Sequence, residues 1–255
     1  MKKPSLRRNN SGQVLIVTSL LVALLLLSTI VFVMETEKDV PTIKTEETDP
    51  FISYQQTEKN TLISALANIT KGGNSSILAS DLETLNTAIT SDSYLSMLQI
   101  NYEPLNATPY QNGIWISWND SQGITSAAVS FALNSSGLYS TSNIQYTTNV
   151  TSEISQNGNN TRIEDSLRQV NLTINLQNEN GPALAQNFTF SFENTNSSWV
   201  KVDSPNITDF DNGTYTVTFN IETAQTHNPI YVQTLCQDQR GIITGANTTC
   251  GDVPP

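Results

Sequence analysis

Groups that carry chemistry are scarce in this chain of 255 residues. It has one histidine, His227, and two cysteines, Cys236 and Cys250, so no His/Cys cluster with zinc spacing exists. It also has no Gly-x-Ser-x-Gly nucleophile elbow and no phosphate-binding loop. Because an enzyme needs positioned acid, base, nucleophile or metal groups, we expect a protein that is not an enzyme and uses no cofactor.

Charge is also sparse and mostly of one sign. Asp, Glu, Lys and Arg make up 14% of the residues, and the net charge is -11. Such a protein repels the phosphate backbone of nucleic acid, which we therefore exclude as a partner. The low charge content, with abundant Asn, Ser and Thr, is typical of secreted and surface-exposed β proteins and unlike the charge-rich composition of disordered chains.

An acidic turn at residues 209–213, Asp-Phe-Asp-Asn-Gly, has carboxylates of the kind that calcium prefers. The EF-hand spacing fails, however, and no Glu stands at its closing position. A tight turn that enters a strand explains the same residues. The sequence therefore predicts no metal site.

One long apolar run, from Val14 to Met34, is the clearest signal in the sequence. About twenty residues at a rise of ~1.5 Å cross a hydrocarbon core of ~30 Å, so residues 14–34 are expected to form a transmembrane helix in the lipid bilayer. A cleaved signal peptide would have an apolar region of only ~7–15 residues followed by a small-residue cleavage site. No Ala-x-Ala site is present, so we expect the anchor to remain in the mature protein.

The charges on either side of this run predict its orientation. Residues 1–13 carry Lys2, Lys3, Arg7 and Arg8, whereas the linker at residues 35–49 is mainly acidic. Lys and Arg next to a membrane span stay in the cytoplasm. We therefore expect a single-pass cell-membrane protein with a cytoplasmic tail at residues 1–13 and an extracellular ectodomain.

Two features of the ectodomain agree with this topology. The first is a set of Asn-x-Ser/Thr sequons that glycans could use: Asn68, Asn74, Asn119, Asn134, Asn149, Asn159, Asn171, Asn187, Asn196, Asn206, Asn212 and Asn247. The second is the pair Cys236 and Cys250, which an oxidising exterior would allow to form a disulfide. Their loop of about fourteen residues would contribute ~3 kcal/mol in the chain-entropy model, and a bridge between two copies is the alternative.

Helical periodicity follows the linker, over residues 50–98. Pro50 suits the first position of a helix, Leu62 and Leu66 share one face, and Lys71-Gly72-Gly73 ends the run. A second helix is expected from the capping box at residues 80–83. The apolar stripes of both helices are expected to pack against each other or against the first β unit.

From residue 99 the apolar period changes to two, as at Val129, Phe131 and Leu133, which predicts an antiparallel β-meander over residues 99–154. The polar, Asn/Gly-rich stretch at residues 155–167 is interpreted as a linker. Several short strands at even spacing then predict a β-sandwich over residues 168–252. The fold class is mainly β, with a transmembrane helix and a short helical segment before the strands.

The turn Asp211-Asn212-Gly213-Thr214-Tyr215 resembles the Asp-x-Gly-x-Tyr corner of immunoglobulin-like domains, and the turn at residues 180–182 resembles that of invasin-type repeats. The resemblance implies an Ig-like sandwich over roughly residues 168–250, in which the hydroxyl of Tyr215 bonds back to the backbone as a tyrosine corner. The second cysteine of true immunoglobulins is replaced here by Val217.

The sequence around Gly12-Gln13, which opens the apolar run, resembles the processing site of archaeal type IV pilin-like precursors. There a peptidase cuts after the Gly. Ser11 stands where such precursors usually have Lys or Arg, and Pro41 and Pro50 interrupt a helix that in pilins runs on into the head. The resemblance covers about the first thirty residues.

Two classes of function remain. We expect a membrane-anchored cell-surface display protein whose Ig-like ectodomain is structural or adhesive, with other surface proteins or surface glycans as candidate partners. The alternative is a pilin-like subunit of a filament or secretion system.

Overall fold

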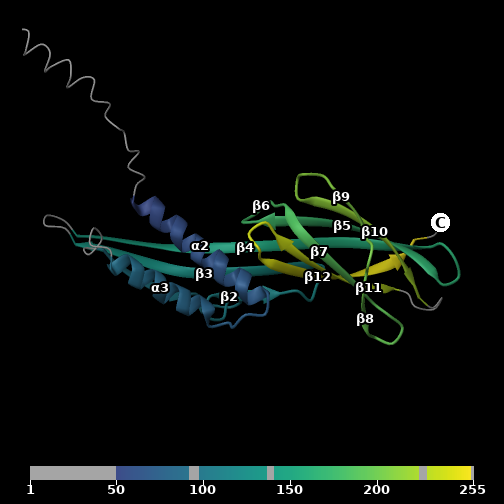
Figure 1. Cartoon of the computed structure of the whole chain (residues 1–255), viewed down its shortest axis with the longest axis horizontal. Coiled ribbons are helices and arrows are strands. Elements are labelled where there is room, and N and C mark those ends of the chain that lie inside the picture. Colours follow the sequence, from purple (N-terminus) through teal and green to yellow (C-terminus); the bar gives the residue numbers. More distant parts are fainter. Residues whose placement is uncertain (1–49, 92–97, 137–140, 224–228, 254–255) are drawn as a thin grey trace, which may run out of the picture. The chain divides into compact units, whose positions relative to one another are not determined.

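The computed structural model describes residues 50–91, 98–136, 141–223 and 229–253 (Figure 1). The expected anchor at residues 14–34, its flanks, the Gly12-Gln13 cut site and His227 lie outside these ranges. Residues 51–255 form one compact unit. Among the residues described, no helix has both the length and the apolar character that a membrane span requires.

Two helices open the described part of the chain, as the sequence predicted. Helix α2 spans Pro50–Thr70 and helix α3 spans Ile77–Ser91. The start expected for α3 at Ser80 is wrong by three residues. The side chain of Asn74 accepts a hydrogen bond of 3.0 Å from the N–H of Ser76, and this turn starts the helix earlier.

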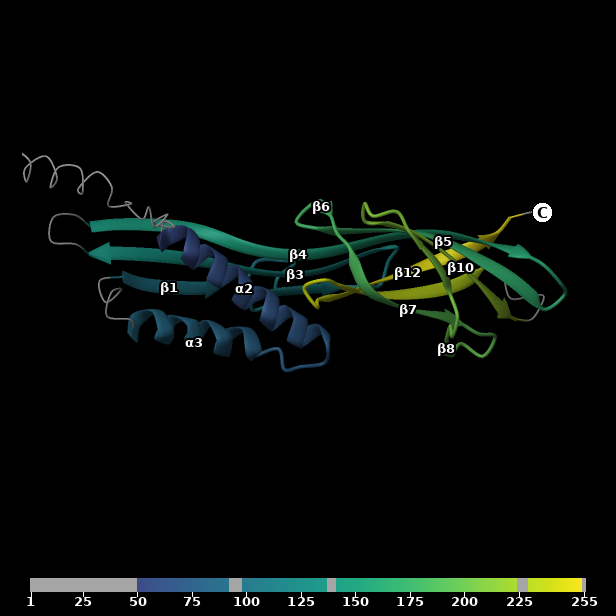
Figure 2. The same cartoon turned by 45° about the horizontal axis from the view of Figure 1, so that its top comes forward.

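Four strands follow the helices: β1 (Leu98–Pro104), β2 (Ile114–Ser117), β3 (Gln122–Ser136) and β4 (Thr141–Arg162). Strand β3 pairs antiparallel with β1, β2 and β4. The period of two seen in the sequence therefore corresponds to antiparallel strands. The helices cover one face of this layer in a shared core with Leu62, Leu66, Phe131 and Leu133 (Figure 2).

The linker expected at residues 155–167 is wrong, because β4 continues to Arg162 and β5 begins at Leu167. Asn and Gly residues suggest a loop, yet here β4 pairs with β5 along its second half. Gly158 suits this close packing, since a Cβ there would lie 2.4 Å from Cδ2 of Leu172. The same strand thus serves both halves of the sheet.

Eight strands make up the rest of the chain: β5 (Leu167–Asn178), β6 (Gly181–Pro182), β7 (Ala185–Glu193), β8 (Trp199–Lys201), β9 (Asn206–Asp209), β10 (Thr214–Glu222), β11 (Ile230–Asp238) and β12 (Ile243–Asp252). Within the described ranges, the strands form a mixed twelve-stranded sheet with the order β8-β7-β11-β12-β4-β5-β10-β9. The β12–β4 pair is parallel. The expectation of a mainly β protein is confirmed.

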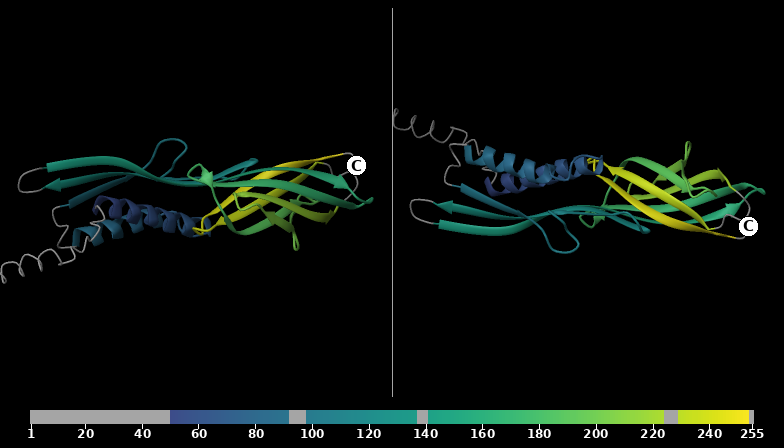
Figure 3. Two further views of the ribbon diagram at one scale, coloured as in Figure 1. Left: turned by 90° about the horizontal axis from the view of Figure 1, so that it is seen from above. Right: turned by 90° about the horizontal axis from the view of Figure 1, so that it is seen from below.

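This path of strands folds over on itself around a second core. Strands β5 and β10 lie across from β7 and β11, as the stacked layers in Figure 3 show. Phe188 packs edge-on against Tyr215 with ring centroids 4.9 Å apart, and Phe190 lies 6.1 Å from Phe219. These aromatic rings pack between the layers together with buried aliphatic side chains such as Val170, Leu172 and Ile174.

Candidate functional site

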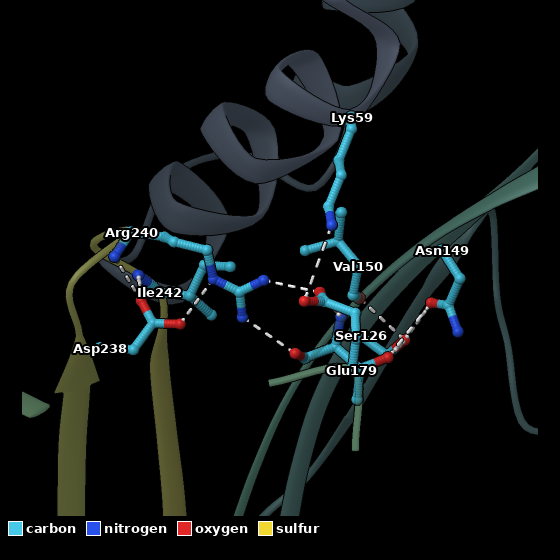
Figure 4. A network of polar contacts seen from close by, with 9 residues as sticks. Lys59, Ser126, Asn149, Val150, Glu179, Asp238, Arg240 and Ile242 are labelled. Atoms are coloured by element: carbon cyan, nitrogen blue, oxygen red, sulfur yellow. Dashed lines mark hydrogen bonds and ion pairs between the residues drawn. The ribbon is translucent and has the colours of Figure 1, made fainter. Parts of the chain in front are cut away.

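A charged network joins α2 to two turns of the sheet (Figure 4). Arg240 donates from Nη1 to Glu179 Oε1 at 2.6 Å and from Nη2 to the carbonyl of Thr151 at 2.9 Å. Its Nε donates to the buried Asp238 at 2.9 Å, and Lys59 Nζ lies 3.8 Å from Glu179. Because these charges are paired with one another, the network is suited to holding elements together rather than to binding a ligand.

A second polar contact closes the helices onto the sheet. Glu58 of α2 is fully buried, and its two carboxyl oxygens lie 2.7 and 2.6 Å from the hydroxyl of Tyr146 on β4. Burial raises the pKa of Glu58 to about 7, although the hydrogen bond with Tyr146 acts in the opposite direction. Burial also raises the pKa of Tyr146.

The phenol of Tyr146 has a single proton, whereas both of its oxygen contacts with Glu58 are short. The phenol can share this proton between the two oxygens, and a protonated Glu58 can in addition donate a hydrogen bond to the phenol oxygen. Glu58 is fully buried and Tyr146 is partly buried, so the carboxyl is covered by the helix and the sheet. Its effect is on the attachment of α2 to the sheet.

The most suitable binding site is a groove on a sheet face, across β2, β3, β4 and β5. The strand register places Ser117 opposite Ile124, Ile124 opposite Glu153, and Glu153 opposite Gln177. Neighbouring strands are ~4.8 Å apart, so these four side chains form a row across the sheet. We call this hollow, lined by these residues and those named next, the Trp115 groove.

A second row, Gln122, Ser155 and Asn175, runs parallel to the first, and Trp115 completes the lining. The cavity volume is about 380 Å³. The ring of Trp115 is held edge-on against Tyr110, with ring centroids 5.8 Å apart and planes at 69°. The groove is therefore built on backbone pairing and has one positioned aromatic ring.

Several polar groups of the groove have no partner within the described part of the chain. The indole N–H of Trp115, the carboxylate of Glu153 and the amide of Gln177 make no hydrogen bond there. Asn175 accepts a bond of 3.0 Å from Thr214 through Oδ1, which leaves its amide N–H groups free for a ligand. The groove thus offers an aromatic ring, one carboxylate and amides to a bound molecule.

The predicted disulfide between Cys236 and Cys250 is not formed. Cys236 on β11 pairs with Thr244, whereas Cys250 on β12 pairs with Ile230. Six residues of ladder separate the two cysteines, or ~20 Å at ~3.3 Å per residue, far beyond the ~7 Å that a disulfide allows. Both thiols are buried, and burial raises the pKa of Cys250 to about 12 and that of Cys236 above its ordinary value.

The hydroxyl of Tyr215 does bond to the backbone, as predicted, but its partner is not the one that a tyrosine corner uses. Tyr215 is buried on β10, and its hydroxyl accepts a hydrogen bond of 2.7 Å from the N–H of Ala185. Ala185 belongs to β7, so the bond joins the two layers, whereas a corner tyrosine bonds to backbone a few residues upstream. Asp211 and Gly213 do form the turn, with φ of 57° and 80°.

The other predicted sites are distributed over the surface. Nine sequon asparagines are exposed: Asn68, Asn74, Asn119, Asn149, Asn159, Asn187, Asn196, Asn206 and Asn212. Asn134, Asn171 and Asn247 are partly buried. No group of three or more His, Cys, Asp or Glu residues suited to a metal occurs within the described ranges. The Trp115 groove was missed, because the only signal for it in the sequence is the polar face of each separate strand.

No family model, curated protein or solved structure matches this chain. Its function must therefore be inferred from its own residues.

Proposed function

We propose that this protein is a membrane-anchored cell-surface display protein whose ectodomain is a structural or adhesive binding module without a catalytic role. The apolar run from Val14 to Met34, with its positive N-terminal flank, supports the anchor and its orientation. The exposed sequons support a glycosylated exterior. The single observation that carries the binding role is the Trp115 groove, with its unpaired polar groups.

The C-terminal half of the ectodomain is proposed to be an immunoglobulin-like sandwich. Its support is the strand order, β4-β5-β10-β9 in one layer and β12-β11-β7-β8 in the other. Immunoglobulin domains have the order A-B-E-D facing G-F-C, and the same order results if β4 is taken as strand A and β12 as strand G. Such domains serve as rigid spacers and as carriers of binding surfaces.

Protease treatment of intact cells tests the topology. With an epitope tag at each end of the chain, external protease should remove the C-terminal tag and leave a short N-terminal fragment in the membrane. A cytoplasmic protein measured in the same cells must stay intact, so that lysis is excluded. Protection of residues 35–255 would overturn the proposed orientation.

The second candidate is a pilin-like subunit of a filament or secretion system, and the Gly12-Gln13 sequence favours it. Against it, α2 begins at Pro50, which suits the start of a new helix better than the interior of one running on from the membrane. N-terminal sequencing of sheared surface filaments separates the two. A mature chain that begins at Gln13 and is recovered in filaments would replace the display proposal. A chain that begins at Met1 or Lys2 and is found only in membranes would support it.

A further inference from the structure

We propose that the Trp115 groove binds a neutral saccharide, such as a short stretch of a hexose-containing glycan. This inference names the ligand class for the proposed surface-binding function. It rests on that function, because only an ectodomain on the cell surface would meet such glycans. The inference is drawn from the chemistry of the groove, which combines one aromatic ring with a row of amide, carboxylate and hydroxyl groups on a rigid sheet.

Trp115 provides the apolar part of the recognition. One face of a pyranose ring is formed largely by C–H groups, and this face packs well on a flat aromatic ring. Trp115 is half-buried and lines the groove. Its N–H makes no bond within the described residues, unlike that of Trp118, which donates to Thr125 at 2.8 Å. Trp115 therefore has both a ring surface and a donor to offer a ligand.

Glu153, Gln177 and Asn175 provide the polar part. Each sugar hydroxyl both donates and accepts hydrogen bonds, and neighbouring hydroxyls suit the planar carboxylate and amide groups, which can make two bonds at once. Glu153 and Gln177 are directly opposite each other in the register, on strands ~4.8 Å apart. A bond to the carboxylate of Glu153 would be charge-assisted and therefore the strongest of the set.

The charge of the groove determines the class of saccharide. Its described lining contains one carboxylate and no Lys, Arg or His. A phosphorylated, sulfated or uronic-acid glycan would be repelled, so the ligand is expected to be neutral. The volume of about 380 Å³ falls at the lower end of the range for ligand pockets, which fits a short stretch of glycan rather than a large ligand.

Strand pairing makes the groove rigid. Its side chains project from four hydrogen-bonded strands, so little ordering is needed on binding. Asn159 and Asn171 face each other further along the same two strands, β4 and β5, and both are sequons. Protein for a binding test should come from a host that does not glycosylate, so that glycans of the chain itself do not occupy the groove.

The test uses the full chain, purified in detergent, on an array of neutral and anionic oligosaccharides, followed by calorimetric titration of the best ligand. Trp115→Ala and Glu153→Gln should each weaken binding at least tenfold. Trp199→Ala is the matched control, because Trp199 is 47% exposed on β8, outside the groove. It should bind like the unchanged protein. Circular dichroism checks folding, and Gln177→Ala, at an exposed position, replaces any variant that does not fold.

Three results would overturn the proposal: no neutral saccharide bound above background, a preference for anionic glycans, or saccharide binding that is unchanged in Trp115→Ala. Capture of a protein segment or of a second copy at the groove, without saccharide binding, would also overturn it. Binding by the purified chain does not depend on membrane orientation. If the purified chain binds no saccharide, the surface-display proposal is therefore unaffected. Conversely, protection of residues 35–255 from protease in cells would contradict the membrane orientation and not the saccharide site.

Discussion

Replacing Glu58 with glutamine should remove most of the pH dependence of stability between about pH 5.5 and 8. The carboxyl is fully buried between α2 and β4, with both oxygens within 2.7 Å of the Tyr146 hydroxyl. Its pKa rises from 4.5 to about 7 on folding, so the folded state holds the proton more tightly than the unfolded state. The resulting stabilisation is complete below pH 4.5 and is lost as the pH rises through about 7.

The size of the effect follows from the two pKa values of Glu58. Their difference corresponds to about 3 kcal/mol in total, of which about 2 kcal/mol is lost between pH 5.5 and 8. Glutamine is neutral at every pH, and its amide can donate to the Tyr146 oxygen while its carbonyl accepts the phenol proton. Glu58→Gln should therefore be more stable than the unchanged protein at pH 8 by about 2–3 kcal/mol, and about equally stable near pH 5.

Urea unfolding of the full chain, followed by circular dichroism at several pH values, measures this. Glu83→Gln is the control, because Glu83 is an exposed carboxylate on the neighbouring helix α3. It should leave the pH dependence of the unfolding free energy unchanged. If Glu58→Gln retains the full pH dependence, or destabilises the protein at pH 8, then Glu58 is ionised in the fold and the two-proton arrangement with Tyr146 is wrong.

Three further outcomes are expected. Cys236 and Cys250 should not react with a thiol reagent in the folded protein, because both are buried free thiols. After denaturation without reductant, two thiols per chain should react, and an intramolecular disulfide found instead would contradict the strand register. Tyr215→Phe should lower the unfolding free energy by about 1–3 kcal/mol, because the N–H of Ala185 loses its acceptor, and an unchanged thermal melt would show that water replaces the hydroxyl. Gly123→Ala should lower the unfolding free energy by on the order of 3 kcal/mol or prevent folding, since the new Cβ would lie 1.5 Å from a backbone carbonyl oxygen of β12. An unchanged unfolding free energy in urea would mean that β3 and β12 can move apart at this point.

Local patterns in the sequence were enough to predict the helices and most strands. The helical spacing of Leu62 and Leu66 corresponds to buried positions on α2, and the alternation of Val129, Phe131 and Leu133 corresponds to the buried face of β3. These predictions succeed because burial of one face imposes a period on neighbouring residues of the same element. Such a period can be read without knowing what covers the face.

Composition was a poorer guide wherever a partner strand decided the conformation. Asn and Gly residues near Gly158 suggested a linker, yet pairing with β5 keeps them in β4. Likewise, the Asp-x-Gly-x-Tyr pattern predicted that the Tyr215 hydroxyl would bond to nearby backbone, but the layer opposite supplies its partner, Ala185. In both cases the deciding contact comes from a segment that the local sequence does not contain.

The sequence by itself determined the polar and apolar faces of single elements, the scarcity of catalytic groups and the apolar run at residues 14–34. Only the tertiary structure decided which faces meet. It places Glu58 against Tyr146, 88 residues away, aligns four strands into the Trp115 groove, and keeps the two cysteines apart on paired strands. The physical reason is that strand register depends on the joint burial of many side chains, so a shift of one residue would exchange the buried and exposed faces of a whole strand.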